Sequence, residues 1–434
     1  MGQSETKNET HLLRVRTITG FLELHHSDFL DKKDDGNGSG LDTKMTECAE
    51  LLRNVQQELH HSNYVVQTLR IATNPFGEWL VDETRDQQVV KSRLNRLDTV
   101  LSINQIEFCS LGPARNREER IVCPIIVSAS GKFSCSAIVP AGDSNVAMEV
   151  AETILFISKL GNEETAPPFV KGGLGNFRFC AACSCQPFIP FFPAAKSEST
   201  DSENANRNDR LKFAVGFENG IAARQLLQEC SSISKIRPDF GNAFAAMLEP
   251  VQAICEVVAN QRNATFLGID SSLNPSLDKD GSVAEAMEQL TELQGCFGRS
   301  GTLSAAAEIT KALQNLPNIK LCGYCGLMLP VCEDTRLAEL AQASSDNDET
   351  RRALRISDLL SISSVCGVGV DTVPIPGDCL KQDLAALILD VAGIAGRWNK
   401  SLSCRVFPVP GRQAGDFTDF GSPYMVNTKI FSIR

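Results

Sequence analysis

The sequence predicts an α/β protein in which strands and helices alternate along the chain. Segments rich in β-branched and aromatic residues, such as 64–72 and 264–269, are followed by amphipathic stretches with helical periodicity. The chain has 434 residues, of which 42% are hydrophobic and 22% charged, so it can bury a large core. In an alternating α/β protein, functional residues are expected where strands end.

The N-terminal half is predicted from apolar runs and from helix-capping residues. Residues 11–24 (HLLRVRTITGFLEL) are rich in β-formers, and Asp42 can cap a helix. Strands are expected at 11–24, 64–72, 121–127, 133–139 and 177–185, and helices at 42–60, 87–103 and 145–160.

The C-terminal half repeats the alternation more clearly. The clearest helix, 379–398, places Leu384, Ile388 and Val391 on one face, and Asp378 is expected at its N-cap. Strands are expected at 211–217, 264–269, 320–331, 403–407 and 429–433, and helices from 220 and at 241–260, 282–293, 302–316, 335–343, 351–361 and 379–398.

Two polar segments interrupt this pattern. Residues 196–210 (KSESTDSENANRNDR) contain one apolar residue and are expected to form a linker or a mobile lid. Residues 32–41 are expected to form a flexible insertion. The predicted organisation is an N-terminal α/β half (1–195), the linker or lid (196–210) and a C-terminal α/β half (211–434).

The charge and the cysteine content disfavour several classes of protein. The chain has 42 basic and 53 acidic side chains and a net charge of −11, whereas nucleic acids and anionic membranes need clustered Lys and Arg. No apolar run is long enough to span a membrane and the N-terminus lacks a secretory pattern, so a cytoplasmic protein is expected. Because the cytoplasm is reducing, the 16 cysteines of the chain are expected to be free, mostly buried thiols. Residues 1–6 fit the myristoylation pattern, but no second membrane signal follows them.

The positions of the histidines and of the paired cysteines argue against histidine-dependent catalysis and against a zinc site. The five histidines all precede residue 62, which disfavours a Ser-His or Cys-His mechanism and a His-based zinc site. The pairs Cys180/Cys183 and Cys322/Cys325 have metal-knuckle spacing, but each lies in an apolar, strand-like run far from the other. Buried thiols are the favoured interpretation of both pairs.

Residues 363–378 (SSVCGVGVDTVPIPGD) concentrate a thiol, glycines and carboxylates, and are predicted to form a functional loop between two helices. Backbone N–H groups at Gly367 and Gly369 would bind substrate and activate Cys366 as a nucleophile. The alternative for Cys366 is a small buried residue that packs under the loop.

Four carboxylates follow apolar segments and are predicted to share one rim. They are Asp270, Glu333, Asp371 and Asp416. Together they would perform acid/base chemistry or bind a hard divalent cation, and Arg412 would hold an anionic substrate group.

Several segments carry a family resemblance: 265–273, 326–334, 363–378, 414–421 and the opening strand 14–19. They resemble domain-of-unknown-function family seven-eleven over most of the chain. The resemblance implies a pyruvate formate-lyase-like fold, with a barrel-like core of about ten strands, surrounding helices and a thiol loop inside. Glycyl radical chemistry is not expected, because residues 405–408 (RVFP) lack the glycine of the required Arg-Val-x-Gly-aromatic pattern.

Three functions stay open from the sequence. The first is an enzyme that acts on a small polar metabolite through carboxylate, metal-assisted or thiol chemistry. The second is a non-catalytic ligand-binding or regulatory protein on an enzyme-like scaffold. The third is a structural or homo-oligomerising protein.

Overall fold

The fold is built on one mixed β-sheet. The computed structural model describes residues 12–30, 40–82, 86–199, 210–343 and 353–433. In that part of the chain the sheet has nine strands in the order β7-β6-β1-β2-β3-β4-β5-β9-β8. The strands are β1 (Arg14–Leu22), β2 (Leu69–Thr73), β3 (Phe108–Ala114), β4 (Phe133–Ile138), β5 (Phe179–Cys183), β6 (Lys212–Glu218), β7 (Thr265–Asp270), β8 (Gly369–Pro376) and β9 (Leu402–Val409). The predicted α/β class is confirmed.

The strands run in two directions. Strands β1 to β5 are parallel to one another. Strands β6 and β9 pair antiparallel with β1 and β5, and β7 and β8 continue the sheet parallel to β6 and β9. Five parallel strands are therefore flanked by two pairs of opposite direction.

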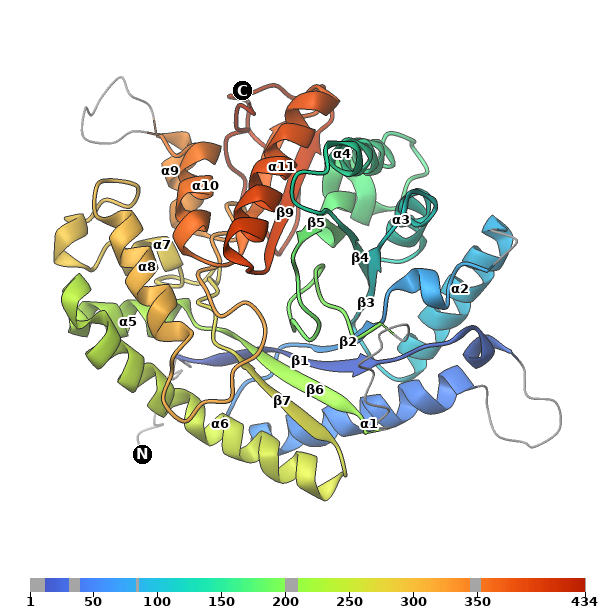
Figure 1. Cartoon of the computed structure of the whole chain (residues 1–434), viewed down its shortest axis with the longest axis horizontal. Helices are drawn as coiled ribbons and strands as arrows, with labels where there is room; N and C mark the ends of the chain where they lie inside the picture. Colours follow the sequence, from blue (N-terminus) through green and yellow to red (C-terminus); the bar gives the residue numbers. More distant parts are fainter. Residues whose placement is uncertain (1–11, 31–39, 83–85, 200–209, 344–352, 434) are drawn as a thin grey trace, which may run out of the picture.

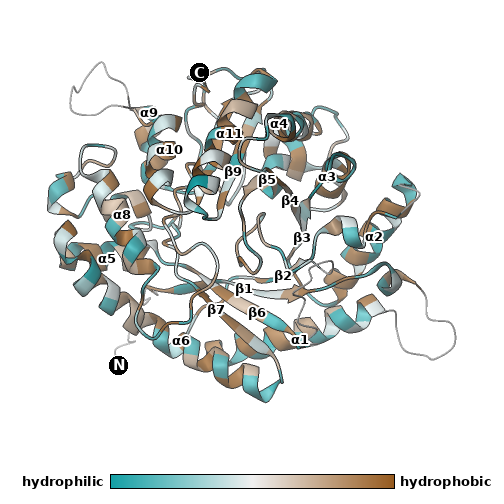
Figure 2. Ribbon diagram, viewed as in Figure 1, coloured by the Kyte–Doolittle hydropathy of each residue, from teal (hydrophilic) through white to brown (hydrophobic). Residues whose placement is uncertain are grey.

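Helices cover the outer face of the curved sheet, and loops fill its inner side (Figure 1). Figure 2 shows that these helices carry both hydrophilic and hydrophobic residues, and their apolar sides join the outer face of the sheet in one large core. The helices are α1 (Gly40–His61), α2 (Gln87–Ile103), α3 (Arg117–Ala129), α4 (Ser144–Lys159), α5 (Gly220–Cys230), α6 (Gly241–Gln261), α7 (Val283–Met287), α8 (Thr302–Leu313), α9 (Thr335–Gln342), α10 (Ile356–Val365) and α11 (Lys381–Trp398). Short turns of other helix types are η1 (His26–Phe29), η2 (Phe76–Glu78), η3 (Pro168–Arg178), η4 (Ile233–Lys235), η5 (Ile236–Phe240) and η6 (Thr291–Leu293). None of the helices in the described ranges is long and apolar enough to cross a membrane.

The predicted strand 121–127 is wrong, because these residues lie in α3. Asn116 caps the helix by accepting a hydrogen bond from the Glu119 amide, at 2.9 Å. Buried residues then recur at helical spacing and face the sheet, so the β-branched run is one side of a helix. Strand β4 pairs instead with β5 and with β3, and the sequence did not predict β3.

The predicted loop 363–378 is also wrong over most of its length. Residues 363–365 end α10, and residues 369–376 form strand β8 beside β9. The two prolines that suggested a loop, Pro374 and Pro376, are tolerated because β8 lies at the edge of the sheet. Asp378 is not the N-cap of α11; Leu380 occupies that position.

Two further predicted strands appear only as isolated bridges. Within residues 320–331, Leu321 forms a bridge with β7, and Leu327 forms a bridge with the segment that follows β7. Pro330 forms a third bridge, with β8. This segment therefore touches both edges of the sheet, although the sheet of the described residues is not closed into a barrel. Lys429 forms a single bridge with Phe417 in place of the strand expected at 429–433.

Strands from both predicted halves share the sheet, since β1 pairs with β6 and β5 with β9. The division at 196–210 stays a prediction. Residues 200–209 of that linker or lid, residues 32–39 of the first insertion and the myristoylation pattern at 1–6 lie outside the described residues.

Candidate functional site

A cavity of about 410 Å³ lies on the inner face of the sheet. Its charged lining has five basic and two acidic side chains: Arg16, Arg70, Lys132, Arg178, Arg405, Glu333 and Asp371. Most of the remaining wall is apolar, with the aromatic residues Phe108, Phe169, Phe177, Phe191, Phe192, Tyr324 and Tyr424. An excess of positive charge in a chain of net charge −11 favours an anionic ligand.

The strand register brings polar residues to this inner face. Arg70 on β2 is aligned with Phe108 on β3, and Ser110 on β3 with Ser134 on β4. Because side chains alternate along a strand, the residues between them, such as Ile71 and Cys109, point into the outer core. The inner face of the central strands thus faces the cavity, and their outer face packs in the core.

Two irregularities in the sheet occur at cavity residues. The pairing of β1 with β6 shifts register between Val15 and Thr17, and Arg16 lies at this bulge. The pairing of β8 with β9 shifts between Val370 and Val373, next to Asp371. A β-bulge changes the direction of a side chain locally, and both bulges involve a charged residue of the cavity wall.

Arg405 on β9 is the centre of a buried ion-pair network. Its Nε and Nη2 donate to the two carboxylate oxygens of Asp371 at 2.6 and 2.9 Å, and Nη2 also donates to Glu333 Oε1 at 2.9 Å. Burial opposes the charge, but Asp371 and Glu333 together raise the pKa of Arg405 above its ordinary value. Arg405 therefore holds the two carboxylates in place.

Arg70 differs from Arg405 because most of its hydrogen-bonding capacity is unused. Its Nε donates to Thr68 Oγ1 at 2.9 Å, and its guanidinium lies 5.4 Å from the ring centres of both Phe108 and Phe192. Its terminal nitrogens make no hydrogen bond or ion pair within the described ranges. Burial and the nearby Arg16 lower the pKa of Arg70 to about 9, so the side chain stays cationic at neutral pH. It is a buried cation in the cavity wall whose terminal nitrogens are available to a ligand.

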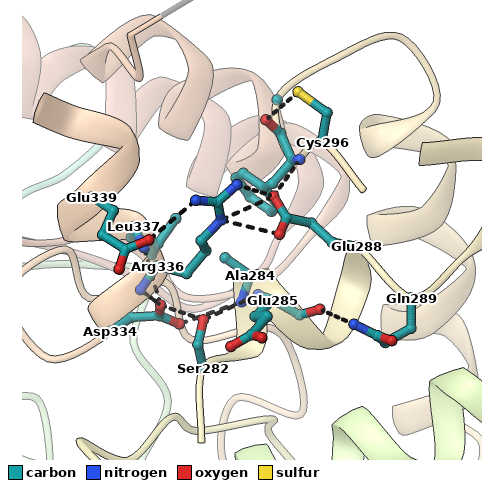
Figure 3. A network of polar contacts seen from close by, with 12 residues as sticks. Ser282, Ala284, Glu285, Glu288, Gln289, Cys296, Asp334, Arg336, Leu337 and Glu339 are labelled. Carbon is teal, nitrogen blue, oxygen red and sulfur yellow. Dashed lines mark hydrogen bonds and ion pairs between the residues drawn. The ribbon is translucent and has the colours of Figure 1, made fainter. Parts of the chain in front are cut away.

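Glu333 is positioned by its neighbour Asp334. The Asp334 carboxylate accepts hydrogen bonds from the first turns of both α7 and α9, as Figure 3 shows. In the same network Arg336 forms a forked ion pair with Glu288. Burial, and then the charge of Asp371, raise the pKa of Glu333, while Arg405 opposes this. A carboxyl group with a raised pKa keeps its proton to higher pH than an ordinary glutamate does, which suits acid/base exchange.

Asp270 lies outside the cavity lining, and its buried carboxylate binds backbone amides of neighbouring segments. It is fully buried and accepts hydrogen bonds from the amides of Tyr324 (2.8 Å), Cys325 (3.1 Å) and Ser272 (3.0 Å). These bonds place Tyr324, whose hydroxyl donates to Ser403 Oγ at 3.3 Å, in the cavity wall. Asp270 itself is not part of the lining.

The structure brings together two of the predicted carboxylates, Glu333 and Asp371, and separates the others. Asp416 and Arg412 are exposed and do not line the cavity. Gly367 and Gly369 do not line it either; a side chain at Gly369 would collide with the backbone of Ser403. No three His, Cys, Asp or Glu side chains lie together as metal ligands in the described ranges, so those ranges contain no ready site for the divalent cation considered from the sequence.

Comparisons with known proteins agree with the resemblance found in the sequence. The family described as Uncharacterised ACR (DUF711) matches residues 8–423. The chain belongs to this family. A UPF0210 protein of Desulforudis audaxviator is 34% identical over 394 residues, which cover 87% of this chain and 82% of that protein.

Other relatives match over a shorter part. A UPF0210 protein of Limosilactobacillus reuteri is 33% identical over 190 residues, or 42% of this chain, and the chain spans only 40% of that relative's length. The UPF0210 protein of Methanocaldococcus jannaschii is 31% identical over 165 residues, 38% of this chain and 34% of that protein. The names of these relatives carry no reaction.

Sequence reasoning missed the basic residues of the cavity. Arg70 and Arg405 each interrupt an otherwise apolar strand, LRIAT and LSCRVFPV. A charged residue in the middle of a buried strand is costly unless it is paired, so it indicates an ion pair or a ligand. That signal was available in the sequence.

Cys366 is buried in the outer core, away from the cavity lining. Its Sγ accepts a hydrogen bond from the Leu327 amide at 2.9 Å, and burial raises the pKa of the thiol.

Because a buried, protonated thiol reacts slowly, we expect an alkylating reagent to label Cys366 at least about 100-fold more slowly than the partly exposed Cys296. Peptide mapping by mass spectrometry after timed labelling measures this ratio. Preferential labelling of Cys366 would restore the nucleophile hypothesis.

Proposed function

We propose that the protein is an enzyme that acts on a small anionic metabolite bound in the 410 Å³ cavity. Arg70 binds the anionic group, and Glu333 acts as the general acid or base. The observation that supports this most strongly is the buried Arg70 guanidinium, whose terminal nitrogens lack partners in the described ranges. A buried cation is costly without a counter-ion, and a bound carboxylate or phosphate would supply one.

The roles of the neighbouring groups follow from their contacts. Asp371 is occupied by Arg405 on both oxygens, so it serves as a fixed negative charge that orients Arg405. Glu333 accepts a single bond from Arg405, which leaves its second oxygen for substrate. The phenylalanine side chains of the wall contact the apolar part of the substrate and exclude water.

The alternative function is non-catalytic binding of the same anion. The close Arg405–Asp371–Glu333 network favours it, since carboxylates held by an arginine can serve structure alone. The two proposals share Arg70 and differ in the role of Glu333. Replacement of Glu333 by glutamine should abolish turnover in the first and leave ligand binding intact in both.

A thermal-shift screen of small carboxylates and phosphates tests the shared claim. A ligand at about 100 times its Kd is expected to raise Tm by about 3–6 °C. The substitution Arg70→Met should weaken the same ligand about 10- to 100-fold, because charge-assisted hydrogen bonds are lost. The matched control is Arg412→Met at an exposed arginine, which should bind normally. Equal ligand affinity in Arg70→Met and wild type would contradict the proposal.

The raised pKa of Glu333 predicts a pH dependence of stability. Its ordinary value is 4.5, and the folded state binds the proton more tightly than the unfolded state. The stability contributed by protonated Glu333 is thus complete below about pH 4.5 and lost as pH rises through the folded-state pKa. We expect the Tm of Glu333→Gln, relative to wild type, to increase between about pH 4 and pH 8. Calorimetry across this range, with Glu47→Gln as a surface control, measures the trend; a constant or decreasing difference would contradict it.

We also propose the barrel-like, pyruvate formate-lyase-like architecture. The contacts of 320–331 with both sheet edges support it, since a tenth strand there would join β7 to β8. Cytoplasmic location and homo-oligomerisation stay predictions from the sequence.

A further inference from the structure

A second and smaller cavity, of about 210 Å³, lies beside the first. It adjoins β4, β5 and the segment 185–197 that follows β5 and folds back inside the curved sheet (Figure 1). We call this segment the plug. Ala194 of the plug lines both cavities and is the one described residue that they share.

The plug fixes Lys196 at the wall of the small cavity. The Phe188 amide donates to the Lys196 carbonyl at 2.9 Å, and the Ser197 amide donates to the Thr73 carbonyl at 2.9 Å. Among the residues that the structure describes, no carboxylate lines this cavity. The Lys196 amino group has no hydrogen bond or ion pair with any residue that the structure describes. Burial lowers its pKa, as expected of a lysine that lacks a counter-ion.

A second polar group in the same wall also lacks a partner. Ser136 on β4 is 1% exposed, and its Oγ makes no hydrogen bond with any residue in the described ranges. Buried hydroxyls are normally paired, so an unpaired one in a cavity wall indicates a missing ligand or water. This observation is independent of Lys196.

The rest of the wall determines the chemistry of the ligand. Besides the buried thiol of Cys185 and the polar residues Ser184 and Gln186, it consists of small apolar side chains: Pro113, Ile138, Ala182, Pro187 and Ala194. One cation and one hydroxyl match one carboxylate, whereas a dianion or a metal ion would be poorly matched. The apolar part suits a short alkyl chain.

We propose that this cavity is a binding site for a small aliphatic monocarboxylate. The carboxylate pairs with the Lys196 ammonium and accepts a hydrogen bond from Ser136, and its alkyl group packs against Ile138 and Pro113. The site is separate from the Arg70 cavity, so both can be occupied at once.

Titration of the protein with sodium acetate and sodium propionate tests this site. Thermal shift should show a saturable rise in Tm of about 1–3 °C, with sodium chloride at equal ionic strength as the salt control and acetamide as the neutral isostere. Propionate should bind about fourfold more tightly than acetate because it buries one more methylene.

Substitutions in the wall of the small cavity show whether the rise in Tm comes from ligand bound there. Lys196→Met should weaken acetate about 10- to 100-fold, and Lys196→Arg should retain part of the affinity. Ser136→Val, which keeps Lys196 but removes the hydroxyl and narrows the cavity, gives the same test if Lys196→Met does not fold. The part of the acetate response that depends on Lys196 should remain in Arg70→Met, which separates this site from the proposed active site.

The proposal fails if acetate and propionate produce no shift beyond that of chloride. It also fails if acetamide acts equally well. Unchanged acetate affinity in both Lys196→Met and Ser136→Val, or loss of the response in Arg70→Met, would likewise overturn it.

Discussion

Replacement of Arg405 by methionine is expected to lower the free energy of unfolding by about 3–5 kcal/mol. The guanidinium forms two bonds with Asp371 and one with Glu333, and all three side chains are largely removed from solvent. Methionine has a similar length but no charge, so two carboxylates would remain close together without a counter-ion. Urea unfolding of the full chain measures the loss through the midpoint and the slope.

Two further variants show whether the loss comes from the unpaired charges. The exposed Arg412→Met is the matched control and should change stability by less than about 0.5 kcal/mol. In the double variant Arg405→Met with Asp371→Leu, part of the stability should return because one uncompensated charge is gone. A loss below about 1 kcal/mol for Arg405→Met would show that the ion-pair network does not anchor the cavity.

Replacement of Asp334 by alanine is the second large effect, with an expected loss of about 3 kcal/mol. The carboxylate accepts bonds from the Val283 and Ala284 amides at 2.9 and 3.3 Å, and from the Arg336 and Leu337 amides at 3.0 and 3.1 Å. Asp334 thus caps α9 and also binds the first two amides of α7, so alanine would leave buried N–H groups of both helices unpaired. The Tm measured by circular dichroism reports the loss.

An exposed aspartate provides the comparison for Asp334. Asp416 accepts one amide hydrogen bond, from Gln413 at 2.8 Å, so Asp416→Ala should cost less than about 1 kcal/mol. Asp334→Asn keeps an acceptor oxygen and should lie between alanine and wild type. If Asp334→Ala and Asp416→Ala are equally stable, Asp334 does not hold the two helices together.

The sequence contained enough information to locate part of the site. Glu333 and Asp371 follow or interrupt apolar segments, and the structure places both against Arg405. Asp270 and Cys366 share the same local signature but are used differently. Backbone amides occupy the Asp270 carboxylate, and the outer core encloses Cys366. Local sequence cannot distinguish these outcomes, because the partner groups come from distant segments.

The fold was predictable where periodicity was unambiguous. The helix 87–103 and the strands near 212–218 and 265–270 agree closely with the structure. The run at 121–127 failed because a β-branched helix face resembles a buried strand when it is considered without its N-cap, Asn116. The bulges at Arg16 and Asp371 depend on pairing between strands, which no single segment encodes.

A crystal structure with the tightest carboxylate or phosphate ligand from the screen tests the central claim most directly. We expect the anionic group within hydrogen-bonding distance of the Arg70 terminal nitrogens, the apolar part against Phe108 and Phe192, and the free oxygen of Glu333 facing the ligand. A ligand bound outside this cavity, or inside it with its anionic group away from Arg70, would contradict the account.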